Sequence, residues 1–212
     1  MKKLILFGWA CFLCLTTLAQ GKENDEGWIP LWDGKTFEGW KASENPGSFT
    51  IVGGTIKVDG PRAHLYYVGP VESHNFKNFE FKARVKTEPG ANSGIFFHTA
   101  YQEEGWPSKG YEVQVNQTHS DWRKTGSLYS FNDVKEVYVK DNEWYTEHII
   151  VQGDKVTVKI NGKTVMEYVE SEDNNRPADA GEKKIDRGTF ALQAHDPESV
   201  IYYKDIMVKP LP

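Results

Sequence analysis

The sequence predicts an all-β fold, a sandwich or jelly roll of antiparallel strands around one core. Almost every segment is a short run of alternating apolar and polar residues bounded by Gly, Asn, Asp or Pro, and helical periodicity is nearly absent. The aromatic content is high, with 7 Trp, 10 Tyr and 11 Phe, as is common in β proteins. No internal repeat or change of composition indicates a second domain.

The first residues have the features of a secretory signal peptide. Two lysines precede an apolar run that begins at Leu4, and small residues surround a break after Ala19. We therefore predict a signal peptide over residues 1–19, a flexible leader over 20–27 and a single domain over 28–212, either periplasmic or secreted. The apolar run is short for a membrane span, so no span is expected in the mature chain.

Both cysteines, Cys11 and Cys14, lie within the predicted signal peptide. The exported protein would then have no disulfide and no thiol chemistry, so its fold must depend on its core. The roughly 190 residues that follow the signal suffice for one sizeable core. The net charge is −5 with acids and bases interspersed, which predicts no basic stripe and no nucleic-acid partner.

Turn and alternation signals assign the strands of the first half of the domain. The Gly53-Gly54 pair marks a hairpin within residues 49–60. Residues 79–87 alternate strictly between two faces. The apolar face is assigned to the core and consists of Phe79, Phe81, Ala83 and Val85, opposite Glu80, Lys82, Arg84 and Lys86.

The second half of the chain begins with a β-meander over residues 144–170. Its turns are predicted at Gly153-Asp154 and at Asn161-Gly162, and Asn-Gly is the strongest short-range hairpin signal. The polar, proline-bearing segment 170–186 is a predicted loop that could cover a site. A further strand begins at Gly188, and the last strand of the chain stops at two prolines, which cannot continue a ladder.

The segment GYEVQVNQTH, which starts at Gly110, is the most informative one for function. Alternation places Tyr111, Val113 and Val115 on one side, and it places Glu112, Gln114 and Asn116 on the other. An acid in register with two amides is typical of a sheet that lines a site for hydroxylated ligands. We expect function on this face.

Two other strands repeat the same pattern of an apolar face and a reactive face. In NSGIFFHT, Phe96 and His98 share the outer face, and in GTFALQAHDP, Gln193 and His195 do so. If these strands are neighbours of the GYEVQVNQTH strand, their polar residues converge on one concave surface. A single strand histidine or glutamate is usually a surface or satisfied residue, so only the coincidence supports the prediction.

Further candidates lie in the segment RKTGSLYSF and in nearby loops. Tyr129 points outward, and Lys124 either holds a carbonyl or enolate oxygen or is an exposed lysine before a turn. Trp106 and Trp122 either stack on sugars or plug loops. The histidines and glutamates could bind one divalent cation, but their spacing matches no recognised ligand motif.

Several familiar catalytic motifs are missing from the sequence. It contains no HExxH, Walker, GxSxG or dinucleotide-binding motif. The sequence therefore gives no support to assignment as a zincin, a nucleotide hydrolase, a GxSxG serine hydrolase or a Rossmann enzyme.

Taken together, the motifs resemble the 3-keto-disaccharide hydrolase domain family, a concanavalin A-like jelly-roll β-sandwich of two antiparallel sheets common in exported bacterial proteins. The resemblance covers essentially the whole mature chain. It rests on PLWDGKTFEGW at 30–40, FEFKARVKTEPGANSGIFFHT, GYEVQVNQT, KTGSLY, EWYTEHIIVQGDKVTVKINGKTV and GTFALQAHDP. The chain departs from the family pattern at one residue and in one segment: many relatives have Asp in place of Asn116, and Phe-Arg-Asn-Ile in place of residues 203–206.

The resemblance implies cleavage of a glycoside whose sugar a separate oxidoreductase has already oxidised to a ketone at carbon 3. The ketone acidifies the hydrogen at C2, so a base can remove it, the enolate can expel the aglycone from C1, and water can add to the enone. The resemblance implies a concave active face with catalytic Glu112, His195 and Lys124. The implied substrate-binding residues are His98, Gln114, Asn116, Tyr129 and Gln193.

The implied roles leave alternatives open. The base is His195 or Glu112, and the enolate is stabilised by Lys124, by His98 or by a bound cation. The rival function is a non-catalytic carbohydrate-binding module, because this fold hosts lectins as readily as enzymes. An ordinary retaining glucanase is disfavoured, because the sequence lacks an ExDxxE pattern.

Overall fold

The computed structural model describes residues 26–170, 177 and 180–212. The predicted signal peptide, all but the last two residues of the predicted leader, and part of the predicted 170–186 loop lie outside the described residues. In the described part of the chain, no helix has both the length and the hydrophobicity to cross a bilayer.

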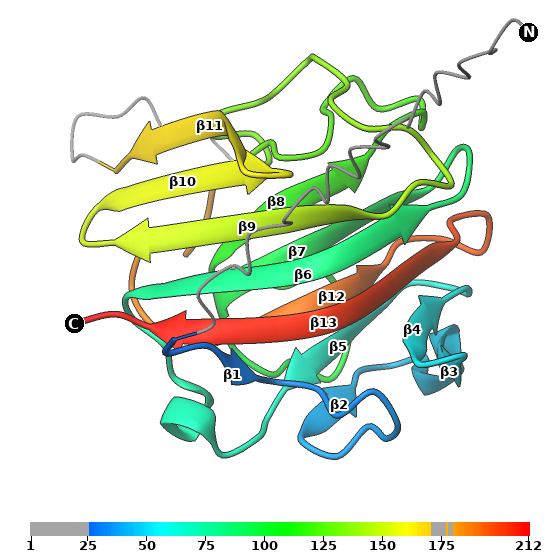
Figure 1. The fold of residues 1–212 in the computed structure, drawn as a ribbon, viewed down its shortest axis with the longest axis horizontal. Helices are drawn as coiled ribbons and strands as arrows, with labels where there is room; N and C mark the ends of the chain where they lie inside the picture. The colour runs from blue at the N-terminus through cyan, green and yellow to red at the C-terminus, as the bar shows by residue number, and fades with distance from the viewer. Residues whose placement is uncertain (1–25, 171–176, 178–179) are drawn as a thin grey trace, which may run out of the picture.

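Two antiparallel sheets pack face to face (Figure 1), which confirms the predicted jelly-roll sandwich. The larger sheet has the order β11-β10-β9-β6-β13-β4-β3, and β1 also pairs with β13. Its strands are β1 (Ile29–Pro30), β3 (Phe49–Val52), β4 (Thr55–Val58), β6 (Phe79–Thr87), β9 (Tyr145–Gln152), β10 (Lys155–Ile160), β11 (Lys163–Val169) and β13 (Ile201–Pro210).

The smaller sheet has the order β2-β5-β12-β7-β8. Its strands are β2 (Trp40–Ala42), β5 (Ala63–Tyr67), β7 (Asn92–Thr99), β8 (Tyr111–Asn116) and β12 (Thr189–Ala194), and two short 3-10 helices cover Pro46–Ser48 and Val71–His74. Because β12, β7 and β8 are neighbours, the three strands with a predicted reactive face do share one sheet.

All three predicted hairpins are present. The turn at Gly53-Gly54 joins β3 to β4, and the turns at Gly153-Asp154 and Asn161-Gly162 join β9, β10 and β11 into a meander. Asn161 adopts a left-handed φ of 50°, as a two-residue hairpin requires. The predicted turn chemistry therefore sets the order of one half of the larger sheet.

Aromatic rings from both sheets fill the core. The predicted inward residues of β6 are fully buried, as their alternation requires. Phe190 of β12 contacts them across the sandwich, with ring centroids 4.8 Å from Phe79 and 4.6 Å from Phe81. These contacts hold the inner face of the smaller sheet and leave its other face for the candidate site.

The bases are less evenly spread in the fold than in the sequence, because strand alternation gathers several on the outer face of the larger sheet. Arg84 lies directly opposite Lys204 in register. Lys82 stacks over Trp28 at 4.1 Å from the ring centroid, and Lys204 stacks over Trp144 at 4.4 Å. Packing against rings accounts for these cations, and the absence of a nucleic-acid partner stays a prediction.

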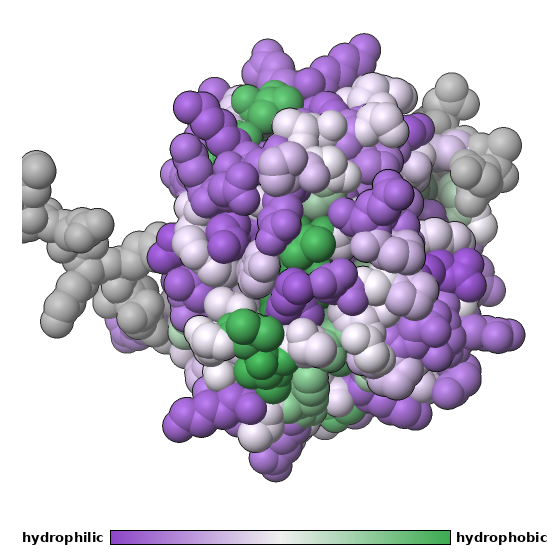
Figure 2. Space-filling model, turned by 90° about the vertical axis from the view of Figure 1, so that its right-hand side faces the viewer, coloured by the Kyte–Doolittle hydropathy of each residue, from purple (hydrophilic) through white to green (hydrophobic). Residues whose placement is uncertain are grey.

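The face seen from the right-hand edge of Figure 1 is mainly hydrophilic. Figure 2 shows that hydrophobic residues there form small separate patches among polar side chains. The described residues on this face therefore offer no broad apolar surface for a partner, and function is better sought in a hollow.

Candidate functional site

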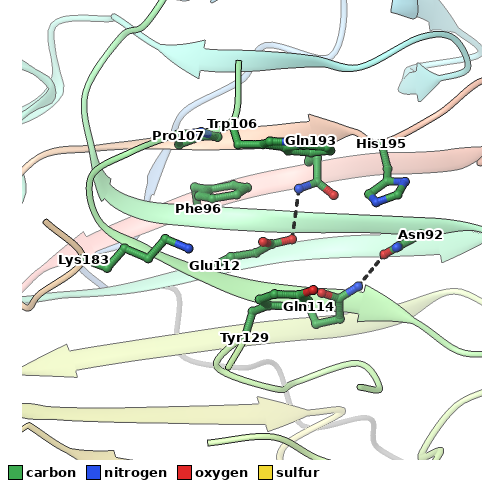
Figure 3. Close-up of a pocket in the computed structure, with 10 residues that line it drawn as sticks. All are labelled: Asn92, Phe96, Trp106, Pro107, Glu112, Gln114, Tyr129, Lys183, Gln193 and His195. Atoms are coloured by element: carbon green, nitrogen blue, oxygen red, sulfur yellow. Dashed lines mark hydrogen bonds between the residues drawn. The ribbon is translucent and has the colours of Figure 1, made fainter. Parts of the chain in front are cut away.

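The outer face of the smaller sheet carries a pocket of about 260 Å³. Register brings its residues together, because Glu112 lies opposite Phe96 and Gln114 lies opposite Gly94 across the β7–β8 pair. Figure 3 shows their side chains turned toward one hollow. The pocket is lined by Asn92, Phe96, Trp106, Pro107, Glu112, Gln114, Tyr129, Lys183, Gln193 and His195.

Glu112 is the acid at the centre of the pocket. Burial raises the pKa of Glu112 to about 7, against the opposing effects of the Lys183 charge and of a hydrogen bond from Gln193. The Gln193 amide donates from Nε2 to Glu112 Oε1 at 3.0 Å. At neutral pH this carboxyl group is therefore close to half-protonated, which is the condition for giving or taking a proton with little driving force.

The two glutamines present acceptors to the pocket. Nε2 of Gln193 is engaged by Glu112, and Nε2 of Gln114 donates to Oδ1 of Asn92. Oε1 of both glutamines is buried and has no hydrogen-bond partner. Because a buried unpaired acceptor is unfavourable, both oxygens are set to receive donors from a ligand, such as sugar hydroxyls.

His195 is held in one orientation by the residue that follows it. Its Nδ1 lies 2.6 Å from Oδ2 of Asp196, and Ser199 Oγ donates to the same oxygen at 3.0 Å. A proton on Nδ1 that is bonded to a carboxylate leaves Nε2 as the nitrogen free to act on a ligand. Trp106 packs against the imidazole, with ring centroids 5.4 Å apart.

Two further pocket residues, Lys183 and Tyr129, carry hydrogen-bond donors. Lys183 comes from the end of the predicted 170–186 loop, so this part of the loop does reach a site, as expected. The Tyr129 hydroxyl faces Asp121 at a long 3.5 Å, and the Arg123 guanidinium lies 4.6 Å from the centroid of the Tyr129 ring. Lys183 can donate to a ligand oxygen, and Tyr129 can do so by turning its hydroxyl away from the long bond to Asp121.

The sequence prediction is wrong for the position of His98. This residue has a left-handed φ of 54°, and the β7–β12 register shifts at the same end of the strand. The alternation is therefore interrupted, and the imidazole turns toward the core, 5.6 Å from the Phe79 ring. Its Nε2 bonds the carbonyl of Lys77 at 2.8 Å, and its Nδ1 accepts from the backbone N–H of Asp186. His98 is a structural residue outside the pocket.

Lys124 and Asn116 also lie outside the pocket, and both hold the loop after β8. Lys124 Nζ donates to the carbonyls of His119 and Asp121 at 2.9 and 2.8 Å. Asn116 Nδ2 donates to the carbonyls of Asp121 and Arg123 at 2.9 and 2.7 Å. Their polar groups are used within the chain, which corrects their predicted places in the site.

Sequence reasoning missed three polar residues of the site, Asn92, Asp196 and Lys183. Asp196 adjoins His195 in the sequence, and this adjacency is a signal that could have found it. Lys183 lies in a loop without periodicity, so no sequence pattern points to it. Among the described residues, no three His, Cys, Asp or Glu side chains gather as metal ligands, so we assign no ligand set for a cation.

Comparison with known proteins gives one family match and one curated relative. Residues 27–209 match the family described as the 3-keto-alpha-glucoside-1,2-lyase-like domain. A 3-keto-disaccharide hydrolase of Bacteroides thetaiotaomicron is 30% identical over 170 residues, which cover 68% of this chain and 59% of the relative. The chain thus spans less than two thirds of that relative's length.

Solved structures share the fold. A candidate glycosyl hydrolase from Parabacteroides distasonis matches with a TM-score of 0.75 and 25% identity, covering 88% of this chain and 95% of the other. The carbohydrate-binding module CBM66 of Bacillus subtilis matches with a TM-score of 0.56 and 11% identity, covering 81% and 95%. The second match shows the fold alone, so the fold does not choose between catalysis and binding.

Gly94, which lies opposite Gln114 across the β7–β8 pair, is expected to be sensitive to substitution. A Cβ there would overlap the Glu112 side chain, whereas a Cβ at Gly47 meets nothing within 4 Å. We expect Gly94→Ala to lower the free energy of unfolding by about 1–3 kcal/mol, and Gly47→Ala to change it by less than about 0.5 kcal/mol. Urea unfolding measures both. In a Glu112→Ala background the Gly94→Ala cost should largely disappear, and an unchanged cost would show that Glu112 is not the clashing group.

The raised pKa of Glu112 predicts a pH-dependent stability difference. With a folded pKa of about 7, above the usual 4.5, the folded state keeps a proton that the unfolded state releases, so wild-type stability falls as pH rises through this window. Glu112→Gln lacks this loss. Its stability relative to wild type should grow by about 1–3 kcal/mol between pH 4 and pH 8 in urea titrations. A difference that is constant with pH would contradict the raised pKa.

Proposed function

This chain belongs to the 3-keto-alpha-glucoside-1,2-lyase-like family, and we propose that it cleaves glycosides whose sugar carries a ketone at C3. The resemblance predicted from the motifs is thereby confirmed at the level of the family. One observation carries the proposal: Glu112, with a pKa of about 7, and His195, fixed by Asp196, line the same small pocket. Two proton-transfer groups beside sugar-type acceptors suit an elimination better than simple binding.

In the proposed reaction a base takes the proton from C2, and the electron pair of that C–H bond forms the enolate with the C3 carbonyl. The enolate then expels the leaving oxygen from C1, a C1–C2 double bond forms, and the leaving oxygen takes a proton from an acid. Water adds across the double bond, with hydroxide at C1 and a proton at C2, so the net change is hydrolysis.

We assign the base to His195 and the acid to Glu112. The Nδ1 bond to Asp196 leaves the Nε2 lone pair for the C2 proton, and it holds the imidazolium that forms. Glu112 is still substantially protonated at neutral pH, so it can give its proton to the leaving oxygen. We assign the enolate-stabilising role first predicted for Lys124 and His98 to Lys183 and Tyr129, because both line the pocket and carry a proton that can be donated to an oxygen.

The acceptors of the pocket also suit a keto sugar. The free oxygens of Gln114 and Gln193 can receive hydroxyl groups, but they have no proton for a ketone. A ketone is an acceptor only, so in this proposal it faces Lys183 or Tyr129 and not the glutamine oxygens. The proposed orientation of a 3-keto sugar has its ketone toward Lys183 and Tyr129 and its remaining hydroxyls toward the glutamines.

The substrate test uses one chromogenic aglycone on two sugars, a 3-keto glucoside and the unoxidised glucoside, with and without chelator. We expect release from the keto substrate only, because only its C2 hydrogen is acidic enough for a protein base. Release from the plain glucoside alone would exclude the elimination, and release from neither would favour the alternative of a carbohydrate-binding module. Loss of activity with chelator would show that a cation is required.

Variants of the proton-transfer groups should lower turnover and leave binding largely intact. His195→Ala and Glu112→Gln should each lower kcat by about 10² or more. Asp196→Asn should lower kcat by about tenfold at an unchanged KM, and Asp196→Glu should restore part of that loss, because Asp196 positions His195 without touching substrate. Wild-type kcat in any of the first three variants would remove that residue from the mechanism.

We further propose that residues 1–19 export the protein and that a separate sugar 3-oxidoreductase supplies its substrate. The proposal rests on the charged, apolar and small-residue regions of the N-terminus. Protein recovered from the periplasm or medium of a bacterial host should begin at Gln20 by N-terminal sequencing. An intact Met1 in a cytoplasmic fraction would contradict export.

A further inference from the structure

The face that carries the pocket continues beyond it onto β5. In the register of β12 and β5, Gln193 lies opposite His64, and Ala191 lies opposite Tyr66. Directly opposed residues of an antiparallel pair point to the same face, so His64 and Tyr66 belong to the face of Gln193. Neighbouring strands are about 4.8 Å apart, so His64 lies about one strand spacing from the edge of the pocket.

The loop over residues 100–110 covers this part of the face. The Trp106 ring lies 5.7 Å from the His64 ring and 5.4 Å from the His195 ring, and Tyr101 lies 5.3 Å from Tyr66. The same loop supplies Trp106 and Pro107 to the pocket wall. The polar face of the sheet therefore continues past the edge of the pocket onto β5, where the 100–110 loop covers it.

The loop is held to the rest of the protein by polar contacts as well as by its rings. The Lys41 ammonium lies 3.7 Å from the centroid of the Tyr101 ring, and Lys109 forms an ion pair with Asp186 at 3.4 Å. The N–H of Gly105 donates to Oε1 of Glu44 at 3.1 Å, and that oxygen also accepts from Arg62 at 2.9 Å. Within the loop, Gln102 Nε2 donates to the carbonyls of Glu104 and Trp106. The loop is thus braced internally, so lifting it requires release of its contacts to Glu44, Lys41, Asp186 and the rings, while its internal hydrogen bonds can stay intact.

Four buried polar atoms beneath and beside this loop have no hydrogen-bond partner. They are both ring nitrogens of His64, the hydroxyl of Tyr66 and Oε2 of Glu44. Burial lowers the pKa of His64 to about 4, so the ring is neutral and charge does not explain its presence. Each unpaired buried group is unfavourable by about 1–3 kcal/mol, and a face that only supported a loop would carry apolar side chains instead.

We propose that His64 and Tyr66 form the subsite for the leaving-group sugar, which becomes accessible when the 100–110 loop lifts. The hydroxyls of a second sugar ring are both donors and acceptors, so they can pair with the imidazole nitrogens and the phenol. Trp106, which is 46% exposed, offers a ring that can cover that sugar. This inference rests on the proposed function and assigns two residues, His64 and Tyr66, to the leaving-group side of the same site.

The test compares Tyr66→Phe with Tyr67→Phe on a 3-keto disaccharide and on the methyl 3-keto glucoside of the same configuration. We expect Tyr66→Phe to raise KM for the disaccharide about tenfold, the value of one hydrogen bond, and to leave the methyl glucoside within about twofold. The hydroxyl of Tyr66 is unpaired, so its removal should not lower Tm. Tyr67 is the matched control, because its hydroxyl accepts from the Val71 N–H away from the face, and its loss should lower Tm without changing the KM ratio of the two substrates.

Equal effects of Tyr66→Phe on both substrates, or none on either, would overturn the subsite. If wild type cleaves neither substrate, the proposed function fails, and the subsite is judged by quenching of tryptophan fluorescence, assigned with Trp106→Phe. Quenching by the disaccharide that Tyr66→Phe weakens would support it. Absence of disaccharide binding, or binding indifferent to Tyr66→Phe, would overturn it.

Discussion

The structure depends on a sheet that is buried on both faces. The inner face of the smaller sheet packs aromatic rings against the larger sheet, and loops cover most of its outer face, so every residue of β5, β7 and β12 is buried. Polar side chains on the outer face are thereby taken out of water. This desolvation raises the pKa of Glu112, leaves two amide oxygens unpaired and makes hydrogen bonds to a ligand favourable.

The site follows from that constraint in a consistent way. Two pairs of polar groups at the pocket are tied within the chain: Gln193 donates to Glu112, and His195 is bonded to Asp196. Such pairing fixes orientation before a ligand arrives, so little reorganisation is needed during reaction. On β5, beneath the 100–110 loop, the ring nitrogens of His64 and the hydroxyl of Tyr66 have no hydrogen-bond partner within the chain.

Strict alternation and Asn-Gly or Gly-Gly turns were sufficient to predict the strands, the core face of β6 and the shared face of Glu112 and Gln193. Alternation failed at His98, where a left-handed residue and a register shift turn the side chain inward, and no sequence pattern announces such a break. It could not foresee Lys183, because a loop has no period. The burial of Glu112 likewise depends on tertiary contacts that the sequence does not display.

The most direct measurement of the proposed chemistry is the fate of the C2 hydrogen. The 3-keto glucoside is cleaved in D2O and the released keto sugar is analysed by NMR at early times, beside the same sugar incubated without cleavage to measure spontaneous exchange. The account predicts deuterium at C2 of the released sugar beyond that background, because the His195 side chain is 33% exposed and the proton it takes can exchange with solvent before hydration. A product that keeps its original C2 hydrogen would contradict the account.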